Sequence, residues 1–383
     1  PVGCPVVASS RRFRWLASVA LVLAACGGIA ADAELRAQSQ GSTSTARVEA
    51  TTTTSTAVPP PPPAETTTVP PPPETTTTPP PAPTTTEAPV RAASAAPAAP
   101  PATAPRARVP LQQPTRVVGD IAPYAGIGTW VDVYDWSHYK GTNPTVGPDQ
   151  VDAMAAEGVQ TLFIQTAKHD TPDLISEREL LEPIIARAHQ RGLRVVAWYL
   201  PTLEDVENDL NRLVASANLD VDGVAVDIES RKVADHVERS ARLIDLSRRL
   251  RQALPGRAIG AIVMPPVQLE VVNPAFWPEF PYREIAASYD VWQTMGYWTD
   301  RKPSSGYRDP FTYTDENIRR LRNNLGNPTA AVSPVGGVGA MGNGDIESFL
   351  RAAVQNGAIG GSIYDWRTTR AEAWPALRGF RTT

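Results

Sequence analysis

The chain has 383 residues, and its 36 Lys and Arg against 40 Asp and Glu give a formal net charge of −4. This small negative charge argues against a nucleic-acid partner, because nucleic-acid-binding surfaces usually carry a basic stripe. The two cysteines, Cys4 and Cys26, both lie near the N-terminus. The remainder of the sequence therefore offers no disulfide, no thiolate nucleophile and no cysteine-bound metal.

Residues 1–26 have the pattern of an export signal. Three arginines, at positions 11, 12 and 14, precede the apolar run Trp15–Ala25, which has the length of a signal-peptide core and is too short to span a bilayer. The run ends in Leu-Ala-Ala-Cys-Gly at 23–27, which resembles the bacterial lipobox. That resemblance implies a lipid on Cys26 and a membrane-anchored protein outside the cytoplasm, facing the cell wall. An ordinary signal peptide and plain secretion are the alternative.

Residues 27–117 form a low-complexity segment rich in Thr, Pro and Ala. Of the 39 prolines, 20 lie between Pro59 and Pro114, whereas 24 of the 26 aromatic residues follow Val117. Such a segment cannot bury enough apolar surface to offset its ordering entropy, so we expect a disordered linker. Residues 118–383 are then the folded domain, and their length matches the ~250 residues typical of a (β/α)8 TIM barrel.

After Val117 one pattern recurs eight times, namely a short apolar run, a polar or aromatic tip, a loop and an amphipathic stretch. The expected strands are Gly128–Val133, Gln160–Gln165, Arg194–Leu200, Gly223–Ile228, Ala258–Met264, Val291–Tyr297, Thr329–Val335 and Gly361–Tyr364. The expected helices are Pro148–Glu157, Ser176–Arg191, Leu203–Ala217, Lys232–Leu254, Tyr282–Ser288, Thr314–Leu325, Asp345–Asn356 and Ala371–Arg378. Near-continuous apolar strands are typical of a parallel sheet covered on both faces. Without a glycine-rich phosphate motif after the first strand, the pattern favours an α/β fold of the closed TIM-barrel type over an open sheet.

The strongest local feature is Asp-Gly-Val-Ala-Val-Asp-Ile-Glu at 222–229. Strand side chains alternate, so Ala225, Asp227 and Glu229 should face the barrel interior, with the Cα atoms of the two acids ~6.6 Å apart. Charging both acids is costly, so their pKa values should separate. Glycosidic cleavage uses one neutral carboxylic acid and one carboxylate in this way. A divalent cation site and a purely structural pair are the alternatives.

Residues 222–229 resemble the DGxDxDxE motif of family 18 glycoside hydrolases, the chitinase-like barrels. They match it at the Asp-Gly pair, at Asp227 and at Glu229, and depart from it at Ala225, where the family has its first inner Asp. The segment 295–297, Met-Gly-Tyr, resembles the Met-x-Tyr of the family's sixth strand, although Trp298 follows it instead of an Asp.

The resemblance implies a role for each matching residue. Glu229 would be the general acid and base, and Asp227 would orient the substrate's acetamido group, which itself attacks the anomeric carbon. Tyr297 would hold the carbonyl oxygen of that group, and Trp366 would form an aromatic floor for the sugar. Ala225 leaves open the alternative of a catalytically inactive barrel that binds glycan.

A second resemblance is to family 25 lysozymes, which begin with a strand-tip Asp and cut peptidoglycan. It rests on the segment 131–136, Val-Asp-Val-Tyr-Asp-Trp, and on the Asp-x-Glu at 227–229. Both families act on polymers of N-acetylated glucosamine type. Either resemblance therefore implies a glycosidase acting on an N-acetylhexosamine polymer, such as peptidoglycan or a chitin-like glycan.

Further side chains at the strand ends are expected to bind this glycan. They are Asp132, Gln165, Trp198, Gln293, Met295, Trp298 and Trp366. Aromatic residues of the loops 276–282 and 298–313 are further candidates, because sugar C–H faces stack on aromatic rings. The four histidines show no HxH or HExxH spacing, which disfavours zinc and a metal-dependent hydrolase. We expect no cofactor, no metal and a monomer.

Overall fold

The computed structural model describes residues 119–337, 341–342 and 344–380. The expected signal segment with Cys26 and the expected linker at 27–117 lie outside these residues. Within the described part, no helix combines the length and the apolar character needed to cross a membrane.

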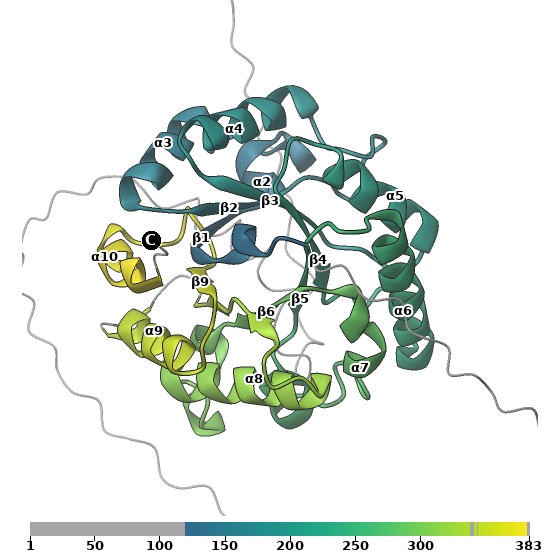
Figure 1. Cartoon of the computed structure of the whole chain (residues 1–383), viewed down its shortest axis with the longest axis vertical. Coiled ribbons are helices and arrows are strands. Elements are labelled where there is room, and N and C mark those ends of the chain that lie inside the picture. Colours follow the sequence, from purple (N-terminus) through teal and green to yellow (C-terminus); the bar gives the residue numbers. More distant parts are fainter. Residues whose placement is uncertain (1–118, 338–340, 343, 381–383) are drawn as a thin grey trace, which may run out of the picture. The chain divides into compact units, whose positions relative to one another are not determined.

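Nine strands form a closed parallel barrel (Figure 1). They are β1 (Gly126–Val131), β2 (Thr161–Gln165), β3 (Arg194–Tyr199), β4 (Gly223–Ile228), β5 (Ile259–Val263), β6 (Val291–Gly296), β7 (Ala331–Val332), β8 (Val335–Gly336) and β9 (Gly360–Ile363). β1 pairs with both β2 and β9, and the pairing of β5 with β6 closes the ring. Both β7 and β8 pair with β6, so these two short strands together fill the seventh position of the barrel. The nine strands therefore occupy eight positions. They are separated at Pro334, which lacks the N–H that a continuous strand would use.

Helices surround the strands on the outside of the barrel (Figure 1). They are α2 (Val133–Trp136), α3 (Pro148–Glu157), α4 (Arg178–Gln190), α5 (Val206–Ala217), α6 (His236–Ala253), α7 (Tyr282–Ile285), α8 (Pro310–Leu325), α9 (Asp345–Gln355) and α10 (Trp374–Leu377). Short 3-10 helices lie at Ala122–Tyr124, Tyr139–Gly141, Ala286–Ser288, Trp298–Asp300, Pro303–Ser305, Ala371–Ala373 and Arg378–Phe380, and a π-helical turn at Gln268–Val272. The predicted (β/α)8 TIM barrel is therefore confirmed.

Several element boundaries differ from the sequence prediction because a side chain caps the helix that follows, as at the end of β1 and the start of α8. β1 ends at Val131 instead of Val133, because the Asp132 side chain accepts the backbone N–H of Tyr134 and caps α2. α8 begins at Pro310, four residues before the predicted start. Asp309 caps it by accepting the N–H of Thr312, and a proline fits the first helical turn, where its missing N–H leaves no bond unmade.

Tyr124 closes the N-terminal end of the barrel. Its ring is fully buried, and its hydroxyl donates to the carbonyl oxygens of Val224 at 2.6 Å and Ala258 at 3.2 Å. Glycines make room for the ring, since a Cβ at Gly260 would lie 2.7 Å from a ring carbon and one at Gly223 would lie 2.9 Å from the hydroxyl. Because core side chains fill this end, the site must lie at the opposite, C-terminal end of the strands.

Candidate active site

A pocket with about 220 Å³ of space, part of it open to solvent, lies at the C-terminal end of the barrel. Its lining residues are Trp130, Trp198, Asp227, Ile262, Met295, Tyr297, Val335 and Tyr364. Four of these are aromatic and one is acidic. The pocket therefore presents ring faces around a single carboxyl group.

The acid pair comes from the alternation of β4. Ala225 faces the barrel interior, where its Cβ lies 3.2 Å from the place that a Cβ of Gly260 would take. Two residues further along, Asp227 lines the pocket, with 7% of its surface exposed. Glu229 follows directly after the strand and is half-buried. The orientation predicted from strand periodicity is confirmed for Ala225 and Asp227.

Burial raises the pKa of Asp227 well above its usual range, and the nearby Glu229 carboxylate raises it further. The Lys168 ammonium opposes this shift in part. One carboxyl oxygen of Asp227, Oδ1, is buried and has no hydrogen-bond partner. We therefore expect Asp227 to be the protonated member of the pair in the free protein, although the family resemblance gives the acid role to Glu229.

Lys168, three residues beyond the end of β2, is a cationic neighbour of this pair. Its ammonium nitrogen lies 5.4 Å from the ring centroid of Tyr134 and 5.3 Å from that of Tyr139. Burial lowers the pKa of Lys168, while the charges of Asp170, Asp132 and, less strongly, Asp227 raise it. The aromatic faces hold the amine where its charge acts on the acids of the barrel mouth.

The pocket contains three predicted residues besides Asp227, namely Trp198, Met295 and Tyr297. The Trp198 ring lies 6.0 Å from the Trp130 ring in an edge-on arrangement, and its Nε1 is buried without a hydrogen-bond partner. Tyr297 is half-buried. The pocket wall thus holds an indole N–H that no protein atom of the described residues accepts.

Three other predicted residues do not line the pocket. Gln165 is buried, and its Oε1 accepts the backbone N–H of Val133 at 3.1 Å, so it positions the start of α2. Gln293 is fully buried, with no hydrogen-bond partner for either polar atom of its amide. Asp132 is also buried, and it caps α2. Because all three are buried and absent from the pocket wall, the structure does not place them where the predicted substrate would contact them.

Two predicted aromatic contacts are placed differently from expectation. Trp298 is 1% exposed, donates its Nε1 hydrogen to Asp345 Oδ2 at 3.0 Å, and packs 5.4 Å from the Phe349 ring. It is a core residue, and the prediction that it stacks on sugar is wrong because the chain turns it inward after β6. Trp366 donates to Gln150 Oε1 at 3.1 Å and lies outside the pocket.

The aromatic loop after β5 packs on itself. Trp277 and Phe280 are buried, with ring centroids 5.1 Å apart, and the Phe280 ring lies 4.6 Å from that of Tyr282. The Arg239 guanidinium carbon sits 4.2 Å from the Trp277 ring centroid. These rings stabilise the loop and are not available as a stacking surface.

Sequence reasoning missed two wall residues, Trp130 and Tyr364. Trp130 lies on β1, and its Nε1 donates to Ser362 Oγ at 2.8 Å. The alternation of β1 contains this information, since Trp130 is two residues before the strand-end Asp132. Tyr364 follows β9 directly, and its ring lies 5.9 Å from that of Tyr297. Whether Tyr364 or Trp366 lines the pocket depends on the path of the chain beyond β9.

One group among the described residues has carboxylates close enough to share a metal ion, namely Asp132, Asp135 and Asp365. It lies at the same end of the barrel as the pocket, because Tyr364 lines the pocket and donates its hydroxyl to Asp132 Oδ2 at 3.2 Å. The carboxyl groups of the barrel mouth are therefore of two kinds, an acid pair on β4 and a triad where β1 meets β9.

No family model matches the sequence, and no curated protein matches it. Solved structures similar to this chain include the spore cortex-lytic enzyme SleL of Bacillus cereus, at a TM-score of 0.49 and 12% identity over 67% of this chain and 74% of that chain. They also include a family 18 N-acetylglucosaminidase of Paenibacillus barengoltzii, at a TM-score of 0.44 and 11% identity over 66% of this chain and 99% of that chain. A family 18 chitinase of Pseudoalteromonas aurantia has a TM-score of 0.46 and 15% identity over 66% of this chain and 99% of that chain.

Proposed function

We propose that this protein is a glycoside hydrolase acting on a polymer that contains N-acetylhexosamine. The observation that carries the proposal is the position of Asp227, a buried acid with a raised pKa, in a pocket walled by four aromatic rings. Glu229 lies two residues further along the chain, directly after β4. Paired carboxyls of unequal acidity beside aromatic faces suit glycosidic cleavage, in which one acid protonates the leaving oxygen while charge develops on the sugar.

In the proposed mechanism the proton of the pair passes to Glu229 when substrate binds, and Glu229 gives it to the leaving oxygen. Asp227, left as a carboxylate, faces the acetamido group, whose carbonyl oxygen attacks the anomeric carbon and displaces the leaving sugar. Water that has given a proton to Glu229 then opens the cyclic intermediate, with net retention of configuration. Tyr297 holds that carbonyl oxygen through its hydroxyl. These three roles follow from the family 18 resemblance, and the pocket position of Asp227 and Tyr297 supports them.

The lining of the pocket supports contact with one sugar ring. Trp130, Trp198 and Tyr364 are aromatic wall residues that would contact the C–H surfaces of this sugar. The remainder of the polymer would extend over the rim of the barrel.

We further propose that the substrate belongs to the cell envelope, as peptidoglycan or a chitin-like glycan. This rests on the lipobox-like segment ending at Cys26 and on the Pro- and Thr-rich residues 27–117, which would tether a monomeric barrel away from the membrane. Plain secretion would give the same substrate class.

A second candidate function, a glycan-binding barrel without turnover, is favoured by Ala225. Its methyl group provides no hydrogen bond or charge below Asp227. The same pocket would then bind a sugar ring that it does not cleave.

Incubation of the purified protein with peptidoglycan and with chitin oligomers, followed by mass spectrometry of the products, tests the proposal. We expect shortened N-acetylated fragments, and we expect Glu229→Gln to lower turnover by about 10²–10⁴-fold while glycan binding persists. The exposed Glu284→Gln is the matched control and should leave turnover unchanged. Binding without products would support the inactive barrel, and full turnover by Glu229→Gln would refute the assigned acid. Neither binding nor products would refute both functions.

A further inference from the structure

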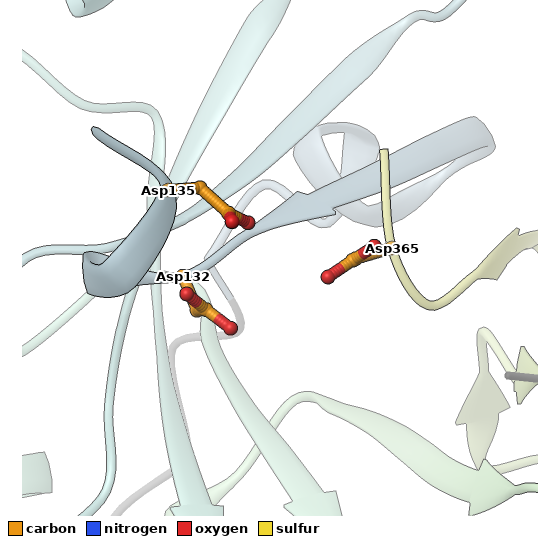
Figure 2. A group of neighbouring side chains, drawn as sticks. All are labelled: Asp132, Asp135 and Asp365. Atoms are coloured by element: carbon orange, nitrogen blue, oxygen red, sulfur yellow. The ribbon is translucent and has the colours of Figure 1, made fainter. Parts of the chain in front are cut away.

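Three carboxylates converge where the first and last strands of the barrel meet. Asp132 follows β1 directly, Asp135 lies in α2, and Asp365 is two residues beyond β9. Figure 2 shows the three side chains directed toward a common space. One carboxylate oxygen from each lies within 4.8 Å of the other two, and all three residues are at most 3% exposed.

Each of these carboxylates is held in place by a group outside the triad. Asp132 Oδ1 accepts the backbone N–H two residues later at 2.9 Å, and Asp365 Oδ1 accepts the backbone N–H three residues later at 2.9 Å. Asp135 Oδ1 accepts from the Arg367 guanidinium at 2.8 Å. The triad is therefore oriented by its surroundings before any ligand binds.

The other oxygen of Asp135, Oδ2, is buried and has no hydrogen-bond partner, and its carboxylate is aimed into the triad (Figure 2). Three carboxylates against the guanidinium of Arg367 leave an excess of negative charge when all are ionised, and the nearby Lys168 ammonium offsets it only in part. A buried excess of negative charge requires either a proton or a cation.

We propose that Asp132, Asp135 and Asp365 bind one calcium ion. Carboxylate oxygens without a histidine or cysteine select a hard cation over zinc. Calcium accepts oxygens at ~2.3–2.6 Å, so two of its ligands lie up to roughly 5 Å apart, which covers the 4.8 Å span of this triad. Magnesium at ~2.0–2.1 Å would need the carboxylates to move together. A divalent ion would also neutralise the excess negative charge of the triad.

The ion would join segments that are 230 residues apart in sequence. β1 pairs with β9, and Arg367 and Tyr364 already bond across this seam to Asp135 and Asp132. Tyr364 also lines the pocket, so calcium at the triad would hold one wall of the pocket as well as the seam. Binding of the ion does not require glycosidase activity, and the two proposals can fail separately.

Calorimetric titration of the chelator-treated protein with calcium chloride, alongside thermal unfolding, tests this site. We expect one site, and at about 100 times the dissociation constant we expect a rise in Tm of about 5 °C or more. Magnesium chloride should give a smaller rise, and sodium chloride of equal ionic strength none.

Asp135→Asn and Asp365→Asn should each abolish the calcium response, while Glu284→Gln, at an exposed position of α7, should keep it. Two triad variants are used so that the test still holds if one of them does not fold. A wild-type protein that shows neither heat of binding nor a change in Tm with calcium would overturn the proposal, and the triad would then share a proton. A full calcium response in both triad variants would overturn it equally.

Discussion

Replacing Asp227 by Asn should make the barrel more stable and the enzyme less active. Asp227 is 7% exposed, and burial with the adjacent Glu229 charge raises its pKa well above the usual range. Asn keeps the size of the side chain and never ionises. The substitution therefore removes the cost of burying an acid that the unfolded chain ionises freely.

The direction and the upper limit of this change in stability follow from proton linkage. A carboxyl group whose pKa is raised in the folded state stabilises the fold below its unfolded pKa, and this contribution is lost as the pH rises toward the folded pKa. In the unfolded chain the carboxyl group has a pKa of ~3.9. Keeping it protonated in the folded protein at pH 7 therefore costs at most about 4 kcal/mol, at ~1.4 kcal/mol per pH unit. We expect Asp227→Asn to gain up to this amount at pH 7 and nothing below about pH 4.

Urea unfolding of the two proteins at a series of pH values measures the difference directly. The gain should grow as the pH rises from about 4, and turnover of the proposed substrate should fall at every pH because the pair has lost one titrating group. The exposed Glu284→Gln is the acid-to-amide control and should show no such trend. Parallel stability curves for wild type and Asp227→Asn would refute the assignment of the buried proton to Asp227.

Three further outcomes are expected. Gly260→Ala should cost about 1–3 kcal/mol in urea unfolding, because its Cβ would lie 2.7 Å from the Tyr124 ring, whereas Gly147→Ala, with open space around its Cβ, should change stability by less than about 0.5 kcal/mol. Trp298→Ala should cost about 3–5 kcal/mol in the same assay by opening a core cavity, and a smaller loss would contradict its placement. Cys26→Ser should move the protein from the membrane to the soluble fraction on centrifugation, and continued retention would exclude the proposed lipid anchor.

Much of the barrel and the acid pair can be predicted from the sequence because both depend on local periodicity. The alternation of apolar and polar residues along 222–229 sets which side chains share a face, whatever the surrounding fold. Six predicted strands of the parallel barrel, for example Gly223–Ile228, agree with the structure to within one residue at each end for the same reason. The rule that strand ends carry the site then placed Asp227 and Tyr297 in the pocket.

Only the tertiary structure decided where the chain goes after each strand. Trp298 and Tyr297 are neighbours in sequence, yet a short 3-10 helix beginning at Trp298 turns one ring into the core and leaves the other at the pocket. The triad of Asp132, Asp135 and Asp365 has no local sequence pattern, because closure of the barrel brings together residues separated by 230 positions. Periodicity describes a single element, whereas these contacts arise from packing between elements that are distant in the chain.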